Sequence, residues 1–109
     1  MREPHRIAEE RSLALHRRVA ELVRAEPSLL GPVRARLREA IAAGGRSAPY
    51  SRAWLALVDG PMDALVERLV ADDDEARALR QSTPFAGLVG PRERWAIWRE
   101  VYDPDKAAP

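Results

Sequence analysis

Along most of the chain, apolar residues recur every three or four positions, which is the spacing of one face of an α-helix. The first segment with this pattern runs from about Pro4 to Ala25. Charged residues in this segment lie mostly off the apolar stripe. The pattern predicts one long helix whose buried face carries Ile7, Leu15, Val19 and Leu22.

Proline and glycine divide the rest of the chain into shorter segments of the same kind. Ser28 and Ser47 are expected to cap the second and third helices through their hydroxyl groups. Gly44 and Gly45 follow the second helix, where glycine accepts the left-handed conformation that ends many helices. The expected helices after the first cover residues 28–43, 47–59, 62–70, 72–80 and 90–101.

No segment shows the strict alternation of apolar and polar residues that is typical of a β-strand. The length of 109 residues is that of one domain. The sequence therefore predicts an all-α fold, a compact bundle of five to six short helices. We expect a single domain over residues 1–103 and a flexible tail at 104–109.

The stretch from Thr83 to Gly90 interrupts this pattern with an apolar loop that contains Phe85. Loops are usually polar, because backbone groups buried in them are hard to satisfy. This loop must therefore pack either against the core of the domain or against a partner. If Phe85 belongs to the core, its replacement by alanine should destabilise the fold; if it lies at an interface, the loss should be in binding.

The last expected helix carries Trp95, Trp98, Val101 and Tyr102 at helical spacing. An aromatic stripe on the last helix of a small domain usually belongs to the core, so we expect both tryptophans there, with Trp98 the better buried. Basic residues among aromatics can also stack nucleic-acid bases. The loop and this helix together give the candidate partner-binding residues, which are Pro84, Phe85, Leu88, Val89, Arg92, Arg94 and Trp95.

Charge is distributed unevenly along a chain with a net charge of +1. Residues 1–54 hold 11 basic and 6 acidic residues, a charge of +5, whereas residues 55–109 hold 7 and 11, a charge of −4. Such asymmetry is compatible with nucleic-acid contact, with head-to-tail self-association, or with no function. The chain has no cysteine, no membrane-length apolar run and no signal-peptide core at its N-terminus, so we expect a cytoplasmic protein.

Residues with catalytic chemistry do not assemble into a recognisable motif. His5 and His16 are eleven positions apart and cannot bind one metal together, so both are expected at the surface or its boundary. Ser12 and His16 are four apart, which allows a hydroxyl–imidazole contact but supplies no third catalytic group. Gly87 and Gly90 do not form a phosphate-binding loop. We expect no catalytic residue, no metal and no cofactor.

Four segments, taken together and in order, resemble a bacterial pattern: RSLALHRRVAELVRAEPSLL, WLALVDGP, LVADDDEARALRQSTPFAGLV and PRERWAIWREV. They are similar to the region that follows the DNA-binding domain in Xre-type helix-turn-helix regulators, many of them antitoxin-like. Thr83 departs from the pattern by separating Ser82 from Pro84. The residues that carry the resemblance are Leu79, Arg80, Ser82, Pro84, Phe85, Ala86, Gly87, Glu93 and Arg94.

The resemblance implies the region that accompanies the DNA-binding domain, without that domain itself, because no room exists for a complete helix-turn-helix domain before Arg11. In antitoxins, the region outside the DNA-binding domain commonly binds the toxin. We therefore expect a non-enzymatic protein-interaction module that binds a protein partner, such as a cognate toxin or a second copy of the chain. The alternative is a small DNA-associated regulator that uses the basic N-terminal half. A membrane partner is not expected.

Overall fold

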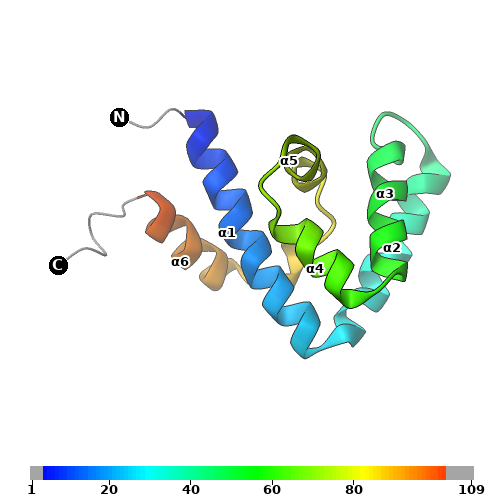
Figure 1. Cartoon of the computed structure of the whole chain (residues 1–109), viewed down its shortest axis with the longest axis horizontal. Coiled ribbons are helices and arrows are strands. Elements are labelled where there is room, and N and C mark those ends of the chain that lie inside the picture. The colour runs from blue at the N-terminus through cyan, green and yellow to red at the C-terminus, as the bar shows by residue number, and fades with distance from the viewer. Residues whose placement is uncertain (1–3, 103–109) are drawn as a thin grey trace.

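The structure is a computed structural model that describes residues 4–102, and over these residues it contains helices and turns without any strand (Figure 1). The predicted all-α fold is confirmed. Residues 1–3 and 103–109, with the tail expected at 104–109, lie outside the described residues. The elements in chain order are α1 (Pro4–Ala25), η1 (Pro27–Leu29), α2 (Leu30–Ala43), α3 (Ala48–Asp59), α4 (Met62–Val70), α5 (Asp74–Gln81), η2 (Ala86–Leu88) and α6 (Pro91–Tyr102).

Helix ends follow the prolines and glycines of the sequence, but the expected serine caps do not form. Neither the 3-10 turn at Pro27 nor helix α3 has a side-chain cap, so the roles predicted for Ser28 and Ser47 are wrong. Gly44 and Gly45 do adopt the predicted left-handed backbone, with φ of 75° and 90°. Asp73 caps α5, since its Oδ1 accepts a hydrogen bond of 2.8 Å from the backbone N–H of Ala76.

Helix α1 is the central element of the bundle (Figure 1). It packs against α6 through one side and against α4, α5 and the η2 turn through others. Helices α2 and α3 form a hairpin that packs mainly on itself and reaches the rest of the domain through α4, α5 and η1. The loop from Thr83 to Gly90 thus joins α5 to α6 across the body of the molecule, where it meets α1.

Phe85 lies at the centre of the core, with no exposed surface. Its ring contacts two others edge-on: Trp54 of α3 at a centroid distance of 5.0 Å and His16 of α1 at 6.5 Å. Trp54 is equally buried, and its Nε1 donates a hydrogen bond of 2.9 Å to the backbone oxygen of Leu79. Three elements that are distant in sequence therefore meet around one phenylalanine.

Some oppositely charged residues of the two halves form ion pairs with each other. Three ion pairs join an arginine of the N-terminal half to a carboxylate of the C-terminal half: Arg18–Glu93 at 2.7 Å, Arg24–Asp63 at 3.0 Å and Arg34–Asp59 at 2.6 Å. All three pairs are at least partly exposed, so each contributes modestly to stability. Their positions nevertheless show that the two halves have opposite charge where they face each other.

Replacement of Phe85 by alanine should lower the free energy of unfolding by about 3–5 kcal/mol, because it removes a fully buried aromatic ring and leaves a cavity. Urea denaturation followed by circular dichroism measures this change. Phe85→Leu is the control and should cost less, since it keeps most of the buried volume. A Phe85→Ala protein as stable as the parent would contradict the central position of this ring.

Candidate functional site

The apolar loop belongs to the core rather than to a contact surface. Phe85 is 0% exposed and Val89 is 1% exposed, so in this fold neither can touch a partner directly. Both were candidate partner-binding residues, and the structure places them in the core, where Phe85 packs against the rings of Trp54 and His16. Pro84 and Leu88 are half-buried and keep some accessible surface.

A continuous chain of hydrogen bonds fixes the loop to α1. His16 Nδ1 lies 2.6 Å from the backbone oxygen of Ser12, and His16 Nε2 lies 2.7 Å from the hydroxyl of Thr83. A carbonyl oxygen can only accept, so Nδ1 carries the ring proton and Nε2 accepts the proton of the Thr83 hydroxyl. Thr83 Oγ1 in turn accepts from the backbone N–H of Phe85 at 3.1 Å. Each polar group in this series of hydrogen bonds therefore has a partner.

His16 was expected at the surface, and the structure places it in the core with 0% exposure. The spacing of Ser12 and His16 allowed a hydroxyl–imidazole contact, but the imidazole meets the backbone oxygen of Ser12 instead. Both ring nitrogens are used in structural bonds. His16 is therefore not placed to activate Ser12 as a nucleophile.

The environment of His16 favours its neutral form. Burial lowers its pKa from the ordinary value of 6.5 to about 4, and the positive charge of Arg80 acts in the same direction. The hydrogen bond to the Ser12 backbone oxygen opposes this shift. The ring is thus neutral at physiological pH, as the bond from the Thr83 hydroxyl requires.

Two arginines donate hydrogen bonds to backbone carbonyl groups, one at the loop and one at the C-terminal end of α4. Arg94 of α6 donates through Nη2 to the oxygens of Ala86 at 2.7 Å and Val89 at 3.2 Å. Arg80 of α5 is only 3% exposed and donates through Nη1 to Ala71 O at 2.6 Å and to Leu69 O at 3.3 Å. These bonds give Arg94, which was a candidate partner-binding residue, a structural role within the domain.

The outer side of α6 carries the exposed part of the predicted site. Trp95 is 60% exposed, so its expected core position is wrong, whereas Trp98 is half-buried and is the better-buried tryptophan, as predicted. The two rings lie edge to face at 6.5 Å, and the guanidinium of Arg11 lies 5.4 Å from the Trp98 ring. Trp98 therefore lies on the packed side of α6, and Trp95 lies on its accessible side.

Two exposed arginines flank Trp95 on the same side of the helix. Arg92 precedes Trp95 by three positions and Arg99 follows it by four, so all three side chains share one helical face. Neither arginine forms an ion pair with any residue between 4 and 102. We call this set, Arg92, Trp95 and Arg99, the Trp95 face. Arg99 was not among the predicted binding residues, although its spacing to Trp95 could have suggested it.

Several residues that carry the resemblance have structural roles here. Leu79 and Phe85 are buried, Glu93 pairs with Arg18, and Arg94 bonds to carbonyl groups of the loop. The sequence reasoning missed Thr83, which looked like a departure from the pattern but supplies the hydroxyl that satisfies His16. No local signal links these two residues, because they are 67 positions apart.

Within residues 4–102, no group of three or more potential ligands is arranged to hold a metal ion. No helix in the same range is long and apolar enough to cross a membrane. The side chain of His5 lies outside the described residues. Comparison of the chain with protein-family models, with curated proteins and with solved structures gives no match.

The buried neutral His16 predicts that stability depends on pH. Between about pH 6.5 and 4 the unfolded chain binds a proton that the folded chain does not, so the free energy of unfolding should fall as the pH falls through this window. The full loss corresponds to about 3 kcal/mol. Urea unfolding at pH 7, 5.5 and 4.5 measures it, with His16→Gln as the non-titrating control. A parent curve as flat as that of His16→Gln would contradict the assignment.

Proposed function

We propose that this protein is a non-enzymatic binding module whose contact surface is the Trp95 face of α6. The observation that supports this most directly is the 60% exposure of Trp95 beside a well-packed core. A tryptophan left in water forgoes a large burial energy, which binding to a partner can recover. Tryptophan and arginine are also the residues most enriched among those that dominate binding energies.

The chemistry of the face indicates the chemistry of the partner. Trp95 offers a flat apolar ring, while Arg92 and Arg99 on either side offer positive charge that no described carboxylate pairs. A complementary surface has an apolar pocket for the ring and carboxylates around it. We infer that the partner is a protein with an acidic rim around an apolar depression.

The packing beneath the face favours rigid presentation. Helix α6 is held to α1 by the Arg18–Glu93 ion pair and to the loop by the bonds of Arg94. Such fixing lowers the entropy that a partner would have to remove on binding. The loop thus supports α6 through these bonds, while its Pro84 and Leu88 keep partly accessible side chains.

The resemblance to antitoxin-like regulators suggests the class of partner. We propose that the module acts in the cytoplasm and binds a cognate toxin. Binding would neutralise the toxin by covering the toxin's functional surface. The residues that carry the resemblance shape the loop and hold α6, so a shared pattern there is consistent with a shared way of presenting this helix.

Substitution of Trp95 by alanine should abolish capture of the proposed toxin while leaving the free energy of unfolding almost unchanged, because the ring is mostly exposed. The measurement is co-purification of the tagged chain with the protein encoded by the adjacent gene, together with growth rescue when both are expressed. Truncation of a dominant interface tryptophan costs at least about 2 kcal/mol of binding energy.

Tyr50 provides a matched control, since it is the other large apolar residue that is exposed among those whose burial the structure describes, at 41%, and it lies on α3. Tyr50→Ala should bind and rescue like the parent. Loss of binding in Tyr50→Ala with retention in Trp95→Ala would move the surface to the α2–α3 hairpin. A parent chain that neither captures the neighbouring protein nor rescues growth would refute the proposal.

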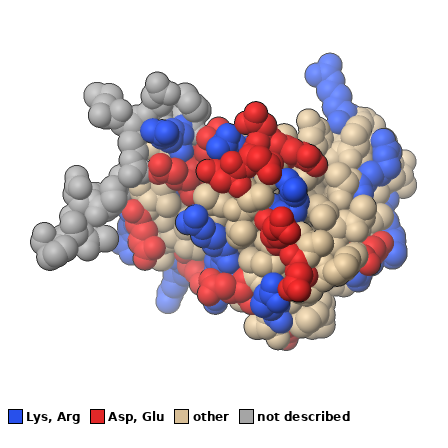
Figure 2. Space-filling view, in the orientation of Figure 1, with Lys and Arg blue, Asp and Glu red and all other residues tan. Residues whose placement is uncertain are grey.

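A second candidate, DNA association, is favoured by the exposed arginines at the α2–α3 end of the molecule (Figure 2). Arg38, Arg46 and Arg52 are exposed and form no ion pair with a described residue. Phosphate binding through them would weaken steeply with salt. An electrophoretic mobility-shift assay at low salt decides the matter, and the absence of a shifted band rejects this candidate.

A further inference from the structure

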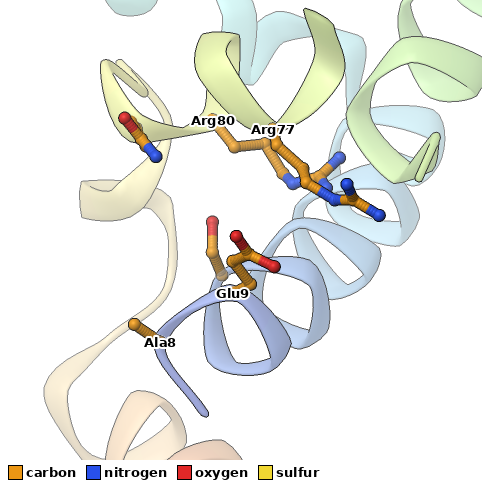
Figure 3. Close-up of a pocket in the computed structure, with 6 residues that line it drawn as sticks. Ala8, Glu9, Arg77 and Arg80 are labelled. Atoms are coloured by element: carbon orange, nitrogen blue, oxygen red, sulfur yellow. The ribbon is translucent and has the colours of Figure 1, made fainter. Parts of the chain in front are cut away.

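A pocket of about 170 Å³ lies between the first half of α1 and helix α5 (Figure 3). It contains one carboxylate, two guanidinium groups, two neutral polar groups and one small apolar side chain, and none of its residues belongs to the Trp95 face. Its lining residues are Ala8, Glu9 and Ser12 from α1 and Arg77, Arg80 and Gln81 from α5.

Arg80 is a buried cation without a carboxylate in contact. It is 3% exposed, and among residues 4–102 no carboxylate oxygen lies within 4.0 Å of its guanidinium. Within the described residues its hydrogen bonds use only Nη1, which donates to backbone oxygens at the C-terminal end of α4. Burial lowers its pKa, which shows that the charged form is poorly solvated there. The remaining donors of the guanidinium are available to an anion in the pocket.

Arg77 lines the same pocket but is already neutralised. Its Nη2 lies 2.8 Å from Asp72 and its Nη1 lies 3.1 Å from Asp74. Only one of the two guanidinium groups therefore lacks an anionic partner. The pocket is suited to a single oxyanion rather than to a multiply charged one.

Glu9 adds a negative charge to a pocket that also holds positive charge. Its side chain projects from α1 toward the guanidinium groups of α5 (Figure 3), yet within the described chain it forms no ion pair with either of them. The gap between Glu9 and Arg80 thus separates an unpaired carboxylate from an unpaired guanidinium. A ligand with a positive group and a negative group at its two ends would complete both.

We propose that this pocket binds a small zwitterion of the α-amino-acid class. The ligand carboxylate accepts hydrogen bonds from Arg80, and the ligand ammonium donates to Glu9. The Ser12 hydroxyl and the Gln81 amide add neutral hydrogen bonds, and Ala8 leaves room for a short side chain. A bare anion would satisfy Arg80 but would face repulsion from Glu9, so the two charges together select against it.

The test is an NMR titration of the full ¹⁵N-labelled chain with three probes: L-alanine, acetate and ethylamine. Alanine carries both charges, whereas acetate and ethylamine each carry one. We expect alanine to shift the Arg80 Nε–H and nearby α1 and α5 amide resonances saturably, with a dissociation constant at least about tenfold lower than that of either single-charge probe.

Glu9→Gln carries the decisive comparison, because Arg80 caps α4 and its replacement risks the fold. Alanine should bind Glu9→Gln no better than acetate does. Glu21→Gln is the matched control, with the same charge change on the same helix at an exposed position outside the pocket lining, and should bind alanine like the parent. The proposal is overturned if alanine causes no saturable shift, if acetate binds as tightly, or if Glu9→Gln keeps full alanine affinity.

Discussion

The packing of Phe85 against Trp54 and His16 is the contact on which the rest of the domain depends. It joins α1, α3 and the loop before α6, three parts of the chain that have no local reason to meet. The polar chain from Phe85 N–H through Thr83 to His16 makes this packing specific, because each buried donor has an acceptor. Breaking it would strand a buried polar group, which costs more than a hydrogen bond contributes when formed.

This core also explains how the surface is divided. With Phe85 and Val89 buried, the loop packs against the core and is bonded to α6 through Arg94. Arg94 uses its charge on loop carbonyls, and three other arginines are paired across the two halves. Among the described residues, charged groups without an ion pair include those of the Trp95 face, of the α2–α3 end and of the pocket beside Arg80. The proposed binding functions are located at such places.

The helices could be predicted because their signals are local. Apolar spacing, prolines and the glycine pair at 44–45 act within one turn, and their effect does not depend on what packs nearby. The candidate site could be predicted only in part. Helical spacing correctly ranked Trp98 above Trp95 in burial, but it could not show that α1 covers only one side of α6 and leaves Trp95 exposed. The serine caps failed because turn geometry, rather than residue type, decides whether a hydroxyl reaches a free N–H.

The sequence by itself determined that this chain forms an all-α domain and that the loop around Phe85 must be covered by something, because apolar side chains cannot remain in water at little cost. Only the tertiary structure decided what covers it. Thr83 and His16 are 67 residues apart, and no neighbouring residue in the sequence predicts the hydrogen bond between them. That bond forms because the fold brings α1 beneath the loop, where burial makes the imidazole neutral and able to accept the threonine hydroxyl.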